Sequence, residues 1–276
     1  MNIAIVTDST SDITSELAME HDIHVVPAIL VVEGRSLEDG KGISREELYQ
    51  RLPAMKTSPT TASPSSGTFQ HIYEAILNKG ADHIISIHVS SLLSGIYNAA
   101  LVAAKAFGSR VHVVDSCHVS FGMGFQVLAA AHAARMGRAI SEILIVIEEI
   151  RKHIHLVAML DTLEYARRSG RISWAQSSIS NLFQIKPFVG IENGIVVRMG
   201  ETRTRQKGIE RLSHMLSELG PLEHLAVLHT NAEDDALQFI DHFKSIVANN
   251  TFIINVTSII GVHVGPKGLG FVAVTG

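Results

Sequence analysis

The chain has 276 residues, of which 46% are hydrophobic and 18% charged, so it has enough apolar material for a sizeable core and is not a disordered chain. Its formal net charge of -4 excludes the overall basic character of a typical nucleic-acid-binding protein. The single cysteine, Cys117, allows no internal disulfide and indicates a reducing compartment. The first residues are typical of a strand, and no apolar run approaches the ~18 residues of a membrane span, so we expect a soluble, cytoplasmic protein without a transmembrane segment.

Short β-branched runs alternate with helical stretches, which predicts an α/β fold. Pro27 lies inside one predicted strand and indicates an edge or a bulge. Residues 44–47 form a capping box at the start of a short helix, and a loop rich in Ser, Thr and Pro follows at 54–67. The strands expected in this half are 3–7, 24–32, 83–89 and 111–114, and the longer helices lie near 67–79, 95–107, 119–136 and 140–152.

The second half continues the alternation, and we place a domain boundary near residue 153, which gives domains 1–153 and 154–276. No Gly/Pro linker marks this junction, and no internal repeat or low-complexity tract is present. The strands expected here are 155–160, a pair around 187–199, 225–229, 252–256 and 271–274, and the helices lie near 162–168, 204–219 and 233–247.

A hydroxyl-rich loop at 56–67 precedes a predicted helix. Its prolines stiffen the backbone, and its hydroxyls offer neutral hydrogen-bond donors. The loop fits either a binding site or a solvated connection in which Ser65 or Ser66 caps the helix.

A second hydroxyl-rich segment, 90–97, lies between a strand and a helix, where open α/β folds bind ligands and where free N–H groups face an anion. Ser94 is either a ligand-binding hydroxyl or only the helix N-cap. Leu92 and Ile96 occupy the glycine positions of a nucleophile elbow, which disfavours a serine hydrolase.

Two further segments leave alternatives open. Three arginines lie at 167–171, where they form either an anion clamp or a solvated last helical turn that complements the dipole. Residues 261–270 contain four glycines, are predicted to be non-helical, and place His263 between apolar neighbours. His263 is then either a satisfied core residue or a ligand-binding group.

Other chemical patterns are weak. Gly122 and Gly124 lie inside a predicted helix, where they favour close helix packing over phosphate binding, and Cys117 beside His118 is a poor candidate for catalysis. The fifteen histidines contain no HExxH motif and mark no third ligand beside His153 and His155, so we expect no metal site.

Taken in order, these segments resemble the DegV family over nearly the whole chain. No single motif is specific, but the ordered set is. The matching segments are 5–12, 61–65, 91–95, 114–116 with 122–124, 163–165 with 170–173, 185–187 and 263–266.

This resemblance implies a two-domain fold with a mostly parallel sheet in the first domain and a second, mixed α/β domain, and a long-chain fatty acid bound between and within them. It implies that Thr61 and Ser94 bind the carboxylate, with Gly95 beside them, that His263 joins their hydrogen-bond network, and that Arg171 lies near the pocket or a partner-facing surface. The protein would be the fatty-acid-binding subunit of a bacterial fatty acid kinase, without a cofactor. It would present the carboxylate to a separate ATP-dependent kinase subunit for phospholipid synthesis, and would not be an enzyme by itself.

Some residues depart from the family pattern. Ala62 and Ser63 stand where serine and glutamine are usual, and Val264 replaces a common threonine. Lys267 replaces a small residue, and Gly42 stands where an aspartate is common. These changes leave the expected carboxylate contacts in place and bear on the surrounding hydrogen bonds, the preferred acyl chain and the partner.

An alternative hypothesis is a stand-alone phosphotransferase or hydrolase that uses Ser94 with His263. A third is a purely regulatory interaction protein. Activity of the lone chain with ATP or an ester would identify the first, and stable binding of a protein partner by a chain with an empty pocket would identify the second.

Overall fold

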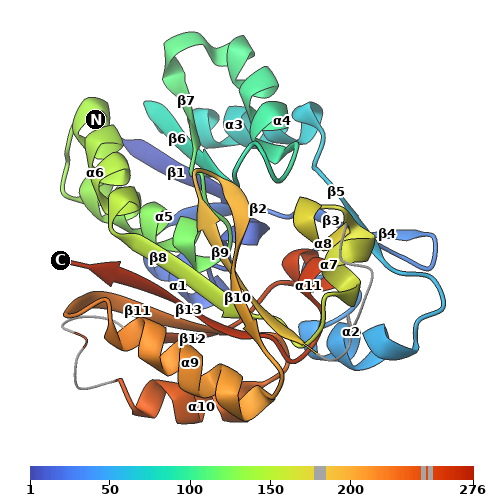
Figure 1. Ribbon diagram of the computed structural model, residues 1–276. Coiled ribbons are helices and arrows are strands. Elements are labelled where there is room, and N and C mark those ends of the chain that lie inside the picture. The colour runs from blue at the N-terminus through green and yellow to red at the C-terminus, as the bar shows by residue number, and fades with distance from the viewer. Residues whose placement is uncertain (177–184, 244–246, 248–250) are drawn as a thin grey trace. The chain divides into compact units, whose positions relative to one another are not determined.

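The computed structural model of the chain describes residues 1–176, 185–243, 247 and 251–276. Contacts divide the chain into two compact units (Figure 1). Unit 1 contains residues 1–29, 61–152 and 193–195, and unit 2 contains residues 30–60, 153–192 and 196–276. The third crossing of the chain between units falls next to residue 153, while residues 30–60, which precede it, pack with unit 2.

Unit 1 is built on a four-stranded sheet in which every neighbouring pair is parallel. The order across the sheet is β2 (Ile23–Val26), β1 (Ile3–Asp8), β6 (His83–His88) and β7 (Val111–Asp115). Its helices are α1 (Ser15–Glu20), α3 (Ser66–Asn78), α4 (Ile96–Ala104), α5 (Phe121–Arg135) and α6 (Ile140–Lys152). The two central strands, β1 and β6, are almost continuously buried, as expected for a parallel sheet covered by helices, and α5 packs on both of them.

Glycine allows the close packing of α5. A Cβ on Gly124 would lie 2.8 Å from the backbone oxygen of Ser11, so only glycine fits without a shift. This confirms the packing role predicted for Gly124.

Unit 2 contains a six-stranded mixed sheet. Its order is β10 (Ile195–Thr202), β9 (Lys186–Glu192), β8 (Ile154–Met159), β13 (Leu269–Thr275), β11 (Leu222–His229) and β12 (Thr251–Asn255). The helices are α7 (Glu164–Ser169), α8 (Ser173–Gln176), α9 (Arg205–Ser217), α10 (Glu233–Asp241) and α11 (Ser258–Val264). The parallel sheet of unit 1 and the mixed sheet of unit 2 confirm the predicted fold class.

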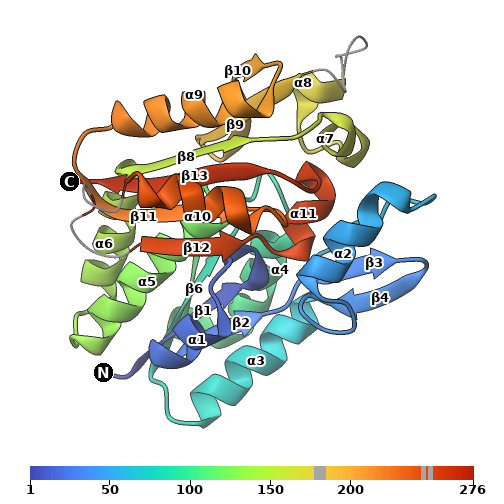
Figure 2. The ribbon, with the colours of Figure 1, turned by 90° about the horizontal axis from the view of Figure 1, so that it is seen from below.

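The two faces of the mixed sheet carry different apolar clusters, because successive side chains of a strand point to opposite faces. Val157, Met159 and Phe188 belong to a large core with residues of α9 and α10, the helices that run along the sheet in Figure 2. Ala158 and Val189 belong instead to a smaller cluster with residues of α7 and α8, against which Val264 of α11 packs.

Residues 30–60 form a small sheet and a helix. The strands β4 (Arg35–Glu38), β3 (Ile29–Val32) and β5 (Thr60–Ala62) lie in the order β4-β3-β5, and α2 (Arg45–Arg51) follows β4 in the chain. Ser44 Oγ accepts a hydrogen bond from Glu47 N at 3.1 Å, which confirms the predicted capping of this helix.

Two sequence predictions are wrong. The strand predicted at 24–32 is two strands in different sheets, because the chain leaves the parallel sheet at Pro27, which has no N–H to donate. Residues 258–264 are helical although Gly261 lies among them, because tertiary packing on this glycine outweighs its low helix propensity. The helix predicted near 233–247 ends at Asp241, and Val247 instead forms a parallel β-bridge with Leu222, while residues 244–246 lie outside the described residues.

No helix in the described part of the chain combines the length and the apolar character that crossing a membrane requires.

Candidate functional site

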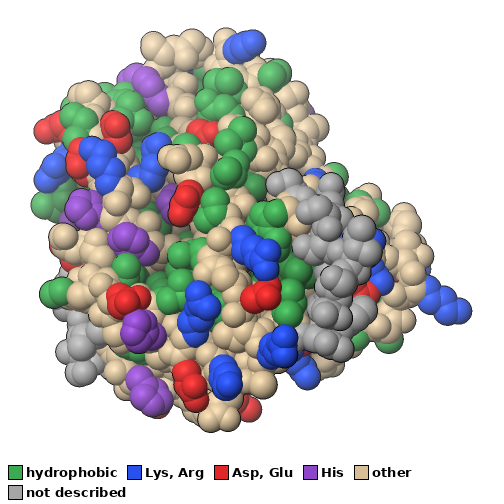
Figure 3. All heavy atoms as spheres, viewed as in Figure 1, with side chains coloured by type: hydrophobic (Ala, Val, Ile, Leu, Met, Phe, Trp, Pro, Cys, Tyr) green, Lys and Arg blue, Asp and Glu red, His purple; other side chains and the backbone are tan. Residues whose placement is uncertain are grey.

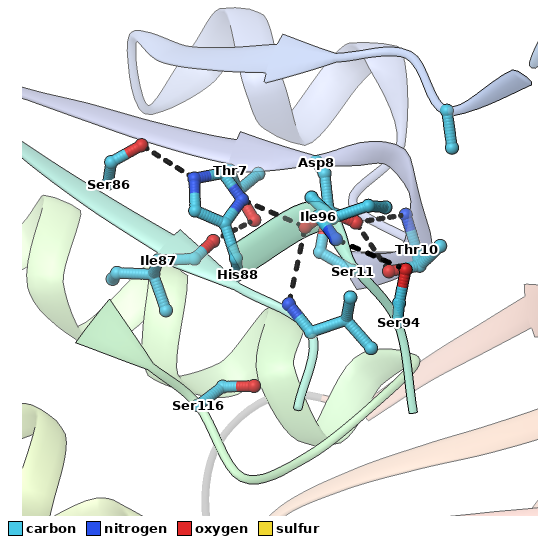
Figure 4. A network of polar contacts seen from close by, with 12 residues as sticks. Thr7, Asp8, Thr10, Ser11, Ser86, Ile87, His88, Ser94, Ile96 and Ser116 are labelled. Carbon is cyan, nitrogen blue, oxygen red and sulfur yellow. Dashed lines mark hydrogen bonds and ion pairs between the residues drawn. The ribbon is translucent and has the colours of Figure 1, made fainter. Parts of the chain in front are cut away.

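A buried network of polar side chains lies at the carboxyl ends of β1 and β6 in unit 1 (Figure 4). The Asp8 carboxylate accepts hydrogen bonds from His88 Nδ1 at 2.9 Å and from Val89 N at 3.2 Å. Its other oxygen accepts from Thr10 N at 3.0 Å and from the Thr10 hydroxyl. Asp8 and His88 are both fully buried, so this cluster of donors stabilises a carboxylate in the core.

The same network continues away from Asp8 into the core. His88 Nε2 lies 2.7 Å from Ser86 Oγ, which in turn accepts a hydrogen bond from the Tyr73 hydroxyl at 2.9 Å. Burial is the main cause that raises the pKa of Tyr73, so its hydroxyl stays protonated and remains a donor.

The serine, histidine and aspartate of this network are arranged like a catalytic triad, but Ser86 is fully buried and already hydrogen-bonded on both sides. A substrate has no route to its hydroxyl in this arrangement. The network instead fixes the backbone at Val89, directly before the hydroxyl-rich segment 90–97.

The predicted site residues of unit 1 lie on two adjoining segments. After β6 the chain turns back on itself, and the N–H groups of Leu93 and Ser94 donate to the backbone oxygen of Ser90 at 2.9 and 3.1 Å. Ser94 Oγ accepts from Ile96 N at 3.4 Å, but the N-cap of α4 is Gly95, so the half-buried Ser94 is not the N-cap of this helix. Its role as a carboxylate ligand stays a prediction.

Gly95 and the segment that contains Thr61 lie against each other. The position that a Cβ on Gly95 would occupy is 3.2 Å from Ser63 Oγ. Thr61 is two residues from Ser63 and is half-buried in β5. Unit 1 therefore brings the Thr61 segment next to the start of α4. A shared binding role for these residues stays a prediction.

The predicted site residues of unit 2 are also neighbours. His263 lies near the end of α11, where burial and, secondly, the positive charge of Arg171 lower its pKa to about 4. Its imidazole is therefore neutral at pH 7. Arg171 is exposed, and its Nη1 donates to the backbone oxygen of Ser169 at 3.0 Å.

A neutral imidazole near an exposed guanidinium favours the binding of an anion. The arginine supplies a positive charge, while the imidazole can donate a hydrogen bond without adding the cost of a buried cation.

The sequence left two alternatives for the arginine segment, an anion clamp or a solvated last helical turn. Arg168 fits the second, because it pairs with Glu164 and its Nη1 lies 3.3 Å from Ser58 Oγ.

A cavity of about 290 Å³ lies in unit 2, on the face of the mixed sheet that packs against α9 and α10. It is lined mainly by apolar side chains, among them Val157, Met199, Met215, Leu219 and Phe271. Val157 and Phe271 belong to the core with α9 and α10, whereas Val264 packs against the cluster of the opposite face. Figure 3 shows hydrophobic side chains among charged ones over β8, β9 and β10. This cavity and His263 therefore do not form one site.

Sequence reasoning missed the pairing of Asp8 with His88. An ionisable residue that ends an apolar strand was the available signal, since two parallel strands bring their carboxyl ends to the same edge of a sheet. Cys117, which was considered for catalysis, has a thiol whose pKa is raised by burial and by Asp115, so it is a poor nucleophile.

The chain combines an all-parallel unit with a mixed-sheet unit, has hydroxyl-rich segments before α3 and after β6, and has a glycine-rich stretch at α11. These features define the class as a two-unit α/β protein. The chain belongs to the DegV family, because the family model described as an uncharacterised protein of the DegV family matches residues 2–276. A DegV domain-containing protein of Streptomyces coelicolor is 35% identical over 276 residues, which cover 98% of each chain.

Solved structures of the family have the same fold. A DegV family protein from Thermus thermophilus, described as binding fatty acid, has a TM-score of 0.92 and 29% identity with full coverage of both chains. DegV from Bacillus subtilis, described as a fatty acid binding protein, has a TM-score of 0.87 and 31% identity, again with full coverage.

Proposed function

We propose that this protein binds one long-chain fatty acid and presents its carboxylate to a separate kinase subunit. The observation that carries fatty-acid binding is the full-length likeness, at 29% and 31% identity, to the two solved proteins described as binding fatty acid. The presentation step, in which the kinase forms an acyl phosphate from ATP for phospholipid synthesis in the cytoplasm, is supported by the resemblance of the sequence motifs to those of the family.

The head group is proposed to lie among uncharged donors. Thr61 and Ser94 would donate hydroxyl hydrogens to the carboxylate, with Gly95 leaving space beside them. His263 would join as a neutral imidazole, and the charge of exposed Arg171 would attract the anion. An unpartnered buried carboxylate costs several kcal/mol or takes up a proton, so these donors are needed for the anionic form to bind.

The tail supplies the driving force. A fatty acid of about 16 carbons has roughly 14 methylenes, each worth about 0.8 kcal/mol when buried, or around 11 kcal/mol in all. Association costs about 4–15 kcal/mol, so the chain must be almost wholly enclosed. The apolar cluster of α7 and α8 is the best candidate surface in unit 2, because Val264, next to His263, packs against it.

The first experiment is to denature the purified protein and to analyse an organic extract by mass spectrometry. We expect one equivalent of long-chain fatty acid for each chain, or stoichiometric uptake of oleate by the delipidated protein. Recovery of no lipid together with no uptake would refute fatty-acid binding.

Thr61→Ala and Ser94→Ala are each expected to weaken oleate binding by about 1–3 kcal/mol, the cost of an unmade buried hydrogen bond. Thr204→Ala is the matched control, because this hydroxyl caps α9 by accepting from Lys207 N at 3.4 Å and has no proposed ligand role. Titration calorimetry measures the three affinities. Wild-type affinity in both site variants would mean that the carboxylate lies elsewhere.

The kinase step is tested with the protein alone and with a DegV-associated kinase added. Acyl phosphate should form from ATP only when both proteins are present. Formation by the lone chain, abolished by Ser94→Ala, would instead support the phosphotransferase alternative.

A further inference from the structure

We propose that Tyr49 and Asp39, which lie in the insertion 30–60, are positioning residues that hold His263 in its binding orientation. This inference rests on the proposed function, since it assigns His263 to the carboxylate site. The insertion is far from His263 in sequence, and its contacts with the start of α11 carry the argument.

The first contact is made by a buried tyrosine. Tyr49 lies on α2, is 1% exposed, and donates its hydroxyl hydrogen to the backbone oxygen of Val256 at 2.7 Å, with the oxygen of Thr257 at 3.3 Å. Both acceptors directly precede α11. The tyrosine therefore fixes the backbone at the point where this helix begins.

The second contact is made by a carboxylate. The fully buried hydroxyl of Thr257, the N-cap of α11, donates to Asp39 and accepts from Ile259 N at 3.4 Å. Asp39 thereby orients the hydroxyl so that its lone pair faces the helix. An amide oxygen is a weaker acceptor than a carboxylate, so Asp39→Asn would loosen the orientation of the cap.

Two more bonds reinforce the same junction. Arg45, at the start of α2, donates to the backbone oxygen of Asn255, and Asn255 Nδ2 donates to Glu46 at 2.8 Å. Successive residues 255–257 are thus each bonded to the insertion.

Packing on a glycine completes the contact. A Cβ on Gly261 would collide with the Tyr49 ring and hydroxyl, so the ring lies directly on the backbone of α11, two residues before His263. At the other end of the helix, the Gly265 oxygen accepts from Thr230 Oγ1 at 2.8 Å. A helix of seven residues has little intrinsic stability, so these contacts determine its orientation and that of His263.

The experiment compares wild type, the double variant Tyr49→Phe/Asp39→Asn and the control Asp234→Asn, which makes the same charge change at an exposed position of α10. The imidazole of His263, assigned by its absence in His263→Gln, is titrated by NMR. Affinities for oleate and for the alcohol of the same chain length are measured in parallel.

In the double variant we expect the affinity for oleate to fall about tenfold and the affinity for the alcohol to change less than twofold. We also expect the pKa of His263 to rise toward its ordinary value of 6.5, because water then reaches the ring. The control should match wild type. A merely structural role would weaken both ligands equally and would leave the pKa of His263 unchanged in the folded protein.

Three results would overturn the proposal. One is an unchanged His263 pKa in a folded double variant, and another is an equal loss of oleate and alcohol binding. The third is a double variant that binds oleate as tightly as wild type while His263→Gln binds it weakly. In that case the proposed function of His263 stands, and only the positioning role fails. If wild type and His263→Gln both fail to bind oleate, the proposed function fails instead, and the NMR titration alone decides whether the insertion positions the ring. If the double variant does not fold, the single variants Tyr49→Phe and Asp39→Asn receive the same measurements.

Discussion

The low pKa of His263 predicts a specific dependence of stability on pH. Burial and the charge of Arg171 lower the pKa to about 4 in the folded protein, compared with an ordinary value of 6.5. As the pH falls below 6.5, the unfolded chain takes up a proton that the folded chain refuses until about pH 4. The stabilisation due to the neutral ring is therefore present above pH 6.5 and is lost as the pH falls toward 4.

The size of this effect follows from the same two pKa values. A difference of one pKa unit between the unfolded and folded states corresponds to about 1.36 kcal/mol. The difference between 6.5 and about 4 therefore predicts that the free energy of unfolding falls by about 3 kcal/mol. His263→Gln removes the titrating group and should lack this component.

The assay is urea unfolding of both proteins at several pH values between 7 and 4, followed by circular dichroism. The difference in free energy of unfolding between wild type and His263→Gln isolates this residue from the other histidines. Parallel pH profiles for the two proteins, or an NMR titration with a midpoint near 6.5, would refute the reasoning.

Three further substitutions test the packing. Asp8→Asn should lower the free energy of unfolding by about 3–5 kcal/mol, because the new amide group would face His88 Nδ1–H and other donors that need an acceptor; a loss below 1 kcal/mol in urea unfolding would contradict the buried network. Gly261→Ala should cost about 1–3 kcal/mol through overpacking against Tyr49. Gly67→Ala, whose Cβ would make an ordinary 3.6 Å contact at the start of α3, should stabilise by roughly 0.5 kcal/mol. Similar melting temperatures for the two glycine variants would show that the Gly261 contact is loose.

Local patterns predicted most elements because their causes lie within a few residues. Ser44 and Ser65 mark the starts of α2 and α3 with side chains that cap the following turn, and the apolar runs of β1 and β6 are buried in a parallel sheet. These features need no knowledge of distant residues.

Apart from the strand that breaks at Pro27, the failures depend on distant residues. Gly261 weakens a helix locally, and only the ring of Tyr49 explains why a glycine is required there. Asp8 and His88 each end an apolar strand, and their hydrogen bond depends on the pairing of β1 with β6. The candidate residues Thr61, Ser94 and His263 came from family resemblance, because a hydroxyl or an imidazole alone has no periodic signature.

The position of β13 has a consequence for synthesis on the ribosome. This strand lies between β8 and β11, and Leu269 pairs with Met159 from much earlier in the chain. While the nascent chain emerges, one edge of β8 has no partner until residues 269–275 have been translated. Chaperones that shield exposed strand edges would therefore be most useful during this interval. Premature termination before β13 would leave an aggregation-prone fragment, because this edge of β8 stays unpaired.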